Sequence, residues 1–351
     1  MAYSTINKHT DYFNTKIYTG TGSSNALTGV GFQPDLTWIK QRNETRNSNL
    51  YDSIRGVQVY IQSSSNGGNG THTNGLTAFG TDGFTVVSQD DVNKNSGTYC
   101  SWNWKAGTTG SGTTGGSGTA KPYSYSVNTT AGFSIVKYTG NATAGHTIPH
   151  HLGAVPKMIL FKQLTGSNVD WRVYHEAIGN THRLCLNDNT ASNNDDSAFN
   201  DTSPTSSVFT VGGSSSTNPS ADVVAYCFAE KTGYSKFGFY KGNGNVDGTF
   251  IYTGFKPAFI MTKRANSTGN WVMFDNRRSL TGGTNEIGYA LLADSTSSES
   301  TGTSSNDVDF LSNGIKIRED NGDLNASNET YVYMAFGQSL VGSNNIPCTA
   351  R

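Results

Sequence analysis

One order of features occurs three times along the chain, and this repetition limits the possible folds more than any other property of the sequence. Each copy contains a Gly-x-x-Pro element, and a lysine follows six residues after the proline. The prolines are Pro34, Pro156 and Pro257, and the lysines are Lys40, Lys162 and Lys263. A chain of 351 residues is also longer than one hydrophobic core usually organises. The sequence therefore predicts three units.

The segments around these elements have the patterns of β-strands. The runs between proline and lysine, 36–39, 158–161 and 259–262, are short and rich in β-branched and aromatic residues. Later runs alternate with the period of two expected of a half-buried strand, at 83–87, 208–211 and 314–318. Only 15% of the residues are charged, whereas there are 41 glycines and 11% aromatic residues. This mixture favours turns and strands, and it predicts an all-β protein of three tandem β-sandwich units.

The units also begin and end alike. Strand-like runs ending in a glycine turn open them at 16–20, 135–140 and 239–242, and long apolar runs close them at 98–104, 223–228 and 330–336. The separation from the proline to the last closing aromatic is 70 residues for Trp104, 72 for Phe228 and 79 for Phe336. This spacing indicates an internal threefold repeat. Buried strand positions are predicted for Trp38, Phe161, Trp104, Phe228 and Phe336, and an exposed position for Ser111.

The joints between the units differ in composition. The predicted boundaries are 1–107 for unit 1, 108–130 for a Gly/Ser/Thr-rich linker, 131–232 for unit 2 and 233–351 for unit 3. Residues 108–119 have the composition of a flexible coil. Residues 230–237 run directly from one closing strand to the next opening strand, so units 2 and 3 are expected to pack closely.

Charge and hydropathy exclude two classes of partner. The net charge is −1 and the basic residues are scattered, so no nucleic acid is expected as a partner. No stretch approaches the roughly 20 apolar residues of a membrane helix, and the first residues lack the apolar core of a signal peptide. We expect a soluble protein made in a cytoplasm and no membrane insertion. Cys100, Cys185 and Cys227 are predicted to be buried free thiols, and Cys348 lies in a polar tail.

Several short motifs carry a resemblance to a known family. They are 5–8 with 11–16, 102–107, 131–136, 233–238, 242–244, 252–258 and the terminal Thr349-Ala350-Arg351. With these motifs the chain resembles a family of marine bacteriophage virion structural proteins of the tail-fibre type. The resemblance implies β-sandwich units, one form of which is the concanavalin-like jelly roll, and a place on the virion. It supplies no catalytic residue, and the His150-His151 pair departs from the His-Gly of that family, so any role of this turn is in doubt.

Catalytic patterns are weak in this sequence. A glycosidase needs two carboxylates at a fixed separation, but Asp195 and Asp196 are adjacent, and adjacent residues of a strand face opposite ways. They are interpreted as a solvated turn. No Gly-x-Ser-x-Gly elbow occurs, and Gly242-Asn243-Gly244-Asn245 fits a hairpin rather than a phosphate loop. We predict no enzyme, no catalytic residue and no cofactor.

Two binding chemistries are weighed against simpler explanations. A metal site is suggested by five histidines of unit 2, which are His146, His150, His151, His175 and His182. The spacing of His146 and His150 fits a zinc-binding helix, whereas the surrounding sequence predicts strands and turns, so ordinary turn and surface histidines and no metal are expected. Trp171 and Trp271 are candidates for a sugar platform. Because they occupy equivalent places in the repeat, they are predicted to be core anchors, and the ligand-binding residues remain unassigned.

These observations lead to a functional hypothesis. The chain lacks the heptads or collagen-like repeats of an extended fibre, so it is predicted to be compact. We expect a bacteriophage virion surface protein, assembled in the host cytoplasm, with a tail-associated role in host recognition. Capsid decoration is the alternative. The expected partners are other virion proteins, a host surface glycan or protein, and further copies of the chain in a homo-oligomer.

Overall fold

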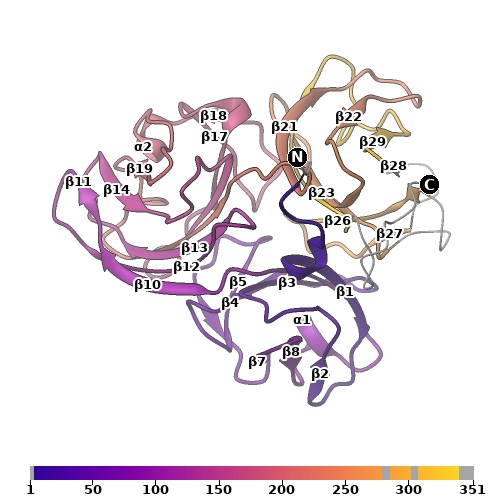
Figure 1. Ribbon diagram of the computed structural model, residues 1–351, viewed down its shortest axis with the longest axis horizontal. Helices are drawn as coiled ribbons and strands as arrows, with labels where there is room; N and C mark the ends of the chain where they lie inside the picture. The colour runs from indigo at the N-terminus through magenta and orange to yellow at the C-terminus, as the bar shows by residue number, and fades with distance from the viewer. Residues whose placement is uncertain (1–3, 279–284, 302–306, 340–351) are drawn as a thin grey trace.

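The computed structural model describes residues 4–278, 285–301 and 307–339 and is shown in Figure 1. Strands account for 44% of it and helices for 4%, and the paired strands in the described ranges are antiparallel. The all-β sandwich prediction is confirmed. Three lobes surround a common centre, with unit 1 in indigo and purple, unit 2 in magenta and unit 3 in orange and yellow.

Unit 1 is a sandwich of a larger and a smaller sheet. Its elements are η1 (His9–Asp11), β1 (Phe13–Thr19), β2 (Asn25–Leu27), β3 (Leu36–Gln41), β4 (Asn49–Asp52), β5 (Val59–Gln62), β6 (Gly70–Thr71), β7 (Leu76–Gly80), β8 (Gly83–Val86), α1 (Asp90–Asn93) and β9 (Thr98–Trp104). The larger sheet has the order β1-β9-β3-β4-β5-β6, and the smaller sheet has the order β2-β8-β7.

Unit 2 has the same two layers and an additional short pair of strands, β17-β18. Its elements are β10 (Thr108–Thr113), β11 (Gly115–Gly116), β12 (Pro122–Asn128), β13 (Phe133–Thr139), β14 (His146–Pro149), β15 (Met158–Gln163), β16 (Arg172–His175), η2 (Glu176–Ile178), β17 (His182–Arg183), β18 (Asn193–Asn194), α2 (Asp196–Phe199), β19 (Val208–Val211) and β20 (Asp222–Phe228). The larger sheet is β10-β12-β13-β20-β15-β16, and the smaller sheet is β11-β14-β19.

Unit 3 completes the described chain. Its elements are β21 (Ser235–Lys241), β22 (Phe250–Tyr252), β23 (Pro257–Arg264), β24 (Trp271–Asp275), β25 (Glu286–Ile287), β26 (Tyr289–Leu292), β27 (Ser300–Thr301), β28 (Val308–Leu311), β29 (Gly314–Ile317) and β30 (Thr330–Gly337). The larger sheet is β21-β30-β23-β24-β26-β27, and the smaller sheet is β22-β29-β28-β25.

The three larger sheets contain the same run of strands. In each of them the opening strand pairs with the closing strand, the closing strand pairs with the strand near the repeated proline, and a fourth strand follows. The runs are β1-β9-β3-β4, β13-β20-β15-β16 and β21-β30-β23-β24. The strand order is thus shared, while common ancestry of the three segments stays a prediction.

The predicted linker has a different structure from the one expected. Residues 108–113 form β10, which pairs along its whole length with β12, and β12 pairs with β13 of unit 2. Two of its glycines lie under tyrosine rings, because a Cβ on Gly110 would come within 2.6 Å of Tyr125 and one on Gly112 within 2.9 Å of Tyr123. The glycines serve close packing of a sheet edge, so the flexible-linker prediction is wrong for this segment. Ser111 is exposed, as predicted.

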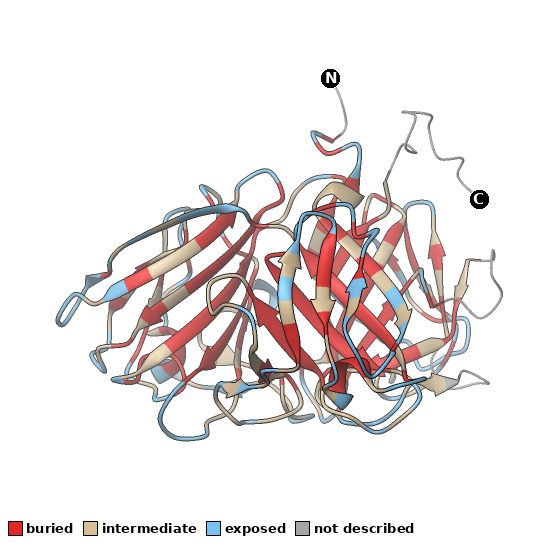
Figure 2. Ribbon diagram, turned by 90° about the horizontal axis from the view of Figure 1, so that it is seen from below, coloured by how far each residue is buried: buried red, intermediate tan, exposed pale blue. Residues whose placement is uncertain are grey.

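Each larger sheet is buried on both faces near the centre of the molecule. Along β3, for example, Trp38 belongs to a core shared by all three units, and its neighbour Ile39 belongs to the sandwich core of unit 1. The separate sandwich cores of units 2 and 3 lie on the far sides of their own larger sheets. Figure 2 shows the resulting continuous burial of the central strands.

Three aromatic rings meet in this shared core, one from each closing strand. The ring centroids of Trp104 and Phe228 are 6.2 Å apart, those of Trp104 and Phe336 are 5.8 Å apart, and those of Phe228 and Phe336 are 6.2 Å apart. They are the last aromatics of the three closing runs, and all are buried as predicted, like Trp38 and Phe161. We call these rings the central triangle. Unit 1 packs against the other two as closely as they pack against each other.

Polar contacts connect each unit to the next in a closed ring. At the end of the fourth strand, Asp52 of unit 1 accepts a hydrogen bond from Tyr226 of unit 2 at 2.7 Å. The equivalent Asp275 of unit 3 accepts one from the Trp102 indole of unit 1 at 3.0 Å.

Unit 2 makes the corresponding contact with different chemistry. Its equivalent residue is His175, and the strand of unit 3 that faces it has Met334 where the other units have Tyr226 and Trp102, so that position supplies no strong donor. The His175 Nε2–H instead donates to the main-chain carbonyl of Tyr333, at 3.1 Å. The neighbouring unit thus explains why unit 2 has His175 where units 1 and 3 have Asp52 and Asp275, and we call this place the Asp-or-His position.

The repeated lysines make a second set of contacts between neighbouring units. Each is fully buried and donates from Nζ to a main-chain carbonyl of the preceding unit: Lys40 to Ser295 at 2.6 Å, Lys162 to Asn66 at 2.8 Å and Lys263 to Asn189 at 3.2 Å. Burial lowers the pKa of all three lysines to about 8. The lysine that marks the repeat in the sequence is thus a contact between units.

Candidate functional site

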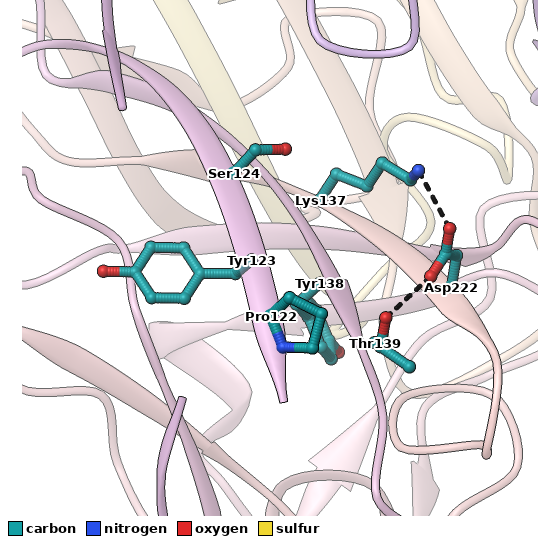
Figure 3. A pocket seen from close by; sticks show the side chains of 7 residues that line it. All are labelled: Pro122, Tyr123, Ser124, Lys137, Tyr138, Thr139 and Asp222. Atoms are coloured by element: carbon teal, nitrogen blue, oxygen red, sulfur yellow. Dashed lines mark hydrogen bonds and ion pairs between the residues drawn. The ribbon is translucent and has the colours of Figure 1, made fainter. Parts of the chain in front are cut away.

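The first candidate is a surface depression on the larger sheet of unit 2, shown in Figure 3, with a volume of about 280 Å³. Strands β12, β13 and β20 line it. Lys137 and Thr139 point toward Asp222, and each makes a 2.8 Å contact with that carboxylate. Burial alone raises the pKa of Asp222, but the hydrogen bonds from Lys137 and Thr139 outweigh it and hold the pKa below its usual range. Asp222 is therefore ionised and paired. It is the only carboxylate among the lining residues.

A second depression lies where units 2 and 3 meet and has a volume of about 440 Å³. Glu176 lies on one side and is ion-paired with Lys157. Tyr333 and His175 form the buried wall, where burial raises the pKa of the tyrosine to about 12 and lowers that of the histidine to about 4. Both wall residues are neutral near pH 7 and suited to hydrogen bonding.

A third depression, of about 320 Å³, is lined by the exposed Asp196 and Asp201 beside Gly212 and Gly213. The neighbouring Asp195 is half-buried and ion-paired with Arg183 at 3.0 Å, so it is not the solvated residue that the sequence suggested. Asp196 is exposed at the start of α2, as expected.

The histidines of unit 2 lie in separate environments. His146, His150 and His175 are buried, which corrects the expectation of turn and surface histidines, whereas His151 and His182 are half-buried. His146 contacts the side chains of Asn218 and Thr114 through its two nitrogens. His150 contacts the main chain of Thr205 and Leu152, and His151 stacks on Tyr125 with ring centroids 3.7 Å apart.

One group in the described ranges has the proximity of metal ligands: Asp170, Cys185 and Asp188. The Cys185 sulfur lies 3.3 Å from the Arg172 guanidinium and 2.9 Å from that of Arg183. Burial raises the pKa of the Cys185 thiol to about 11, so the thiol stays protonated. Two guanidinium groups beside a neutral thiol oppose cation binding. The residues do not fit a metal.

The two tryptophans suggested as a sugar platform are core residues. Trp171 is fully buried, and its indole donates to the carbonyl of Gln62 in unit 1 at 2.9 Å. Trp271 is 1% exposed and donates to the carbonyl of Cys185 in unit 2 at 2.7 Å. The core prediction is confirmed, and both residues serve the contacts between units. Cys100, Cys185 and Cys227 are buried free thiols, also as predicted, and Cys348 is outside the described residues.

The buried His175 gives a testable pH dependence. Burial lowers the pKa of His175 to about 4 in the folded chain. Between pH 6.5 and pH 4 the histidine is therefore protonated in the unfolded chain but neutral in the folded chain. The stability that it contributes is lost as the pH falls through this range. In His175→Gln that loss is absent. Relative to the variant, wild type is expected to lose about 2–3 kcal/mol between pH 7 and pH 4.5, measured by urea unfolding. The control is His182→Gln, at a half-buried histidine, and an equal change in both variants would contradict the assignment to His175.

The geometry defines an all-β protein of three sandwiches closed into a ring, with shallow depressions on its surface. A model of the family described as a domain of unknown function, DUF7483, matches residues 8–339, so the chain belongs to this family. No curated protein and no solved structure matches it. In the described ranges, no helix is long and apolar enough to cross a membrane.

Proposed function

We propose that this chain is a bacteriophage virion surface protein that binds the host cell from the tail. The observation that carries the proposal is the closed ring of units. The same two surfaces of every unit, at the Asp-or-His position and at the repeated lysine, are used to hold its neighbours. The result is a compact body whose loops and outer sheets are left for contacts with other molecules.

The chemistry of the depressions supports binding rather than turnover. In the depression of Figure 3 the lining offers a paired lysine and aspartate with hydroxyl groups of serine and threonine. Such groups exchange hydrogen bonds with polyols or with protein main chain, and weak sites of this kind gain strength when several copies act together. The resemblance to phage virion proteins supplies the setting, namely other virion proteins on one side and a host glycan or protein on the other.

Capsid decoration is the second candidate, and the arrangement of three lobes is compatible with it. A body with three equivalent lobes around one axis fits a threefold position on an icosahedral head, just as it fits the tip of a tail appendage. The two locations differ in the number of sites they provide.

Copy number separates the two. Quantitative mass spectrometry of purified virions is expected to give roughly six to eighteen copies per particle, as tail symmetry requires. Several hundred copies would assign the chain to the head, and its absence from purified virions would overturn the proposal altogether.

A further inference from the structure

Exposed large hydrophobic residues are concentrated in one stretch of the sequence of unit 3. Within the described ranges, seven large hydrophobic residues are classed as exposed, and four of them lie between 239 and 252. Two of these four, Phe250 and Tyr252, flank the buried Ile251 on the three-residue strand β22 and are 42% and 61% exposed. Alternate residues of a strand share a face, so both aromatics stand on the outer face of the smaller sheet, with Cα atoms roughly 7 Å apart.

The fold does not require aromatic residues at these positions. Ile251 pairs with Ile315, just as Leu27 pairs with Phe84 in unit 1 and Ile148 with Phe209 in unit 2. The positions on either side of the buried residue are therefore equivalent in all three units. In unit 1 they are Ala26 and Thr28, and in unit 2 they are Thr147 and Pro149. Unit 3 alone places an aromatic on both sides, which points to a role other than stability.

The sheet beside the two rings has a glycine on the neighbouring strand, as unit 1 has Gly83 at the equivalent position. Gly314 on β29 lies directly opposite Tyr252, so no side chain stands there. A Cβ on Gly314 would come within 2.7 Å of the Phe250 ring and within 2.3 Å of the Ile251 carbonyl oxygen. The glycine thus leaves room for the Phe250 ring over the sheet and places no side chain opposite Tyr252.

Charged groups border this surface, and they neutralise each other. Lys316 pairs opposite Phe250 and makes an ion pair with Asp247 at 2.8 Å. Next to it, Arg318 makes an ion pair with Asp309 at 2.6 Å. Each of these two ion pairs carries no net charge and offers hydrogen-bond donors and acceptors, and Glu286 stands opposite Asp309 on the outer strand β25. We call the surface made by Phe250, Tyr252, Gly314, Lys316 and Asp247 the aromatic face.

We propose that the aromatic face binds an extended chain of neutral pyranose sugars. The apolar C–H face of a pyranose ring stacks on an aromatic ring, whose π-face is electron-rich. The hydroxyl groups at the edge of the sugar reach the charged border and exchange charge-assisted hydrogen bonds with it. Because the charged groups nearest the rings are paired with each other, they favour a neutral polymer, and two rings side by side on one face favour a chain of sugars over a single sugar. The inference rests on the proposed function only for the source of the glycan, the host cell surface.

The test is affinity electrophoresis of the full chain in gels that contain hydroxyethylcellulose, dextran or galactomannan. At least one of these neutral polysaccharides is expected to retard the wild-type protein. In Phe250→Ala and Tyr252→Ala the dissociation constant should rise about tenfold or more, as for an aromatic residue at the centre of a binding surface. Because both side chains are exposed, thermal unfolding should stay close to that of wild type.

Val155→Ala is the matched control. Val155 is 41% exposed, like Phe250, but it lies in unit 2 and lines none of the three depressions, so its loss should leave the retardation unchanged. Retardation by none of the three polymers, or retardation that survives both substitutions, overturns the inference. Tyr252-dependent sedimentation with phosphatidylcholine vesicles in place of polysaccharide binding also overturns it.

The outcome can be separated from that of the proposed function. If virions carry the chain at tail copy number and no polymer retards it, only the aromatic face is refuted. If a polymer retards the chain in a Tyr252-dependent way and virions lack it, the sugar-binding inference stands and the virion proposal fails.

Discussion

Replacement of Trp104 by alanine is expected to lower the free energy of unfolding by about 3–5 kcal/mol, the usual cost of truncating a buried large aromatic residue. The indole is 1% exposed and belongs to the central triangle with Phe228 and Phe336. It also packs on Phe13 of its own unit, with ring centroids 5.0 Å apart. Its removal opens a cavity that borders all three units, so no single unit can close it by a local shift.

Urea unfolding of Trp104→Ala measures the effect. Because the cavity lies in the shared core, one cooperative transition at a lower midpoint is expected. Ser111→Ala, at an exposed position of β10, is the control and should change the stability by less than about 0.5 kcal/mol. A first transition confined to unit 1, with the other units unfolding as in wild type, would show that the shared core does not couple the units.

Removal of the Asp52 carboxylate is expected to have a comparable effect, about 3–5 kcal/mol, for a different reason. Asp52 and Arg55 are joined at 2.5 Å, and their side chains are 0% and 1% exposed. In Asp52→Ala the guanidinium remains buried without its counter-charge, and the Tyr226 hydroxyl of unit 2 loses its acceptor. The cost arises mainly from an uncompensated buried charge, not from the strength of the original ion pair.

Two further variants test this explanation by chemical denaturation. Glu176→Gln breaks the ion pair between Glu176, which is 50% exposed, and Lys157, which is 29% exposed. Because this pair is exposed, its loss should lower the free energy of unfolding by no more than about 1 kcal/mol. Asp52→Leu combined with Arg55→Met removes both charges and should recover most of the stability lost in Asp52→Ala. If the double variant is as unstable as the single one, the loss is due to packing and hydrogen bonding instead of charge.

Strand positions were readable from the sequence because local patterns determine them. The run Leu36-Thr37-Trp38-Ile39 is apolar at every position but Thr37, and it forms a strand buried on both faces. Burial of the second face of this strand was the one indication in the sequence that the units share a core. Which units share it could not be inferred, since the contacts between units join residues far apart in the chain. The predicted linker failed because its composition suits both a coil and a sheet edge. The alternation in Tyr123-Ser124-Tyr125-Ser126 favoured the sheet edge.

Functional residues were harder to infer, because side chains of one type serve opposite roles. The histidines of unit 2 looked like surface residues by their polar neighbours, yet His146 and His150 are buried where side-chain or main-chain groups satisfy their nitrogens. The aromatic residues most suspected of binding sugar, Trp171 and Trp271, are core residues. The exposed pair Phe250 and Tyr252 was not singled out. A comparison of the equivalent positions in the three units would have revealed the pair, because only unit 3 has aromatic residues there.

The closed ring affects how the chain must fold while it is being synthesised. Unit 1 contains the first hundred residues, but the acceptor of Lys40 is Ser295 and the partner of Trp104 in the central triangle is Phe336. At about 5–20 residues per second, Phe336 leaves the ribosome roughly 10–50 s after Trp104. During that interval unit 1 presents a half-covered apolar sheet, and Lys40 has the Arg46 carbonyl as an acceptor but lacks that of Ser295. Strand β30 therefore decides when unit 1 becomes native. A chain truncated before β30 should accumulate as an aggregation-prone intermediate and not as two finished units.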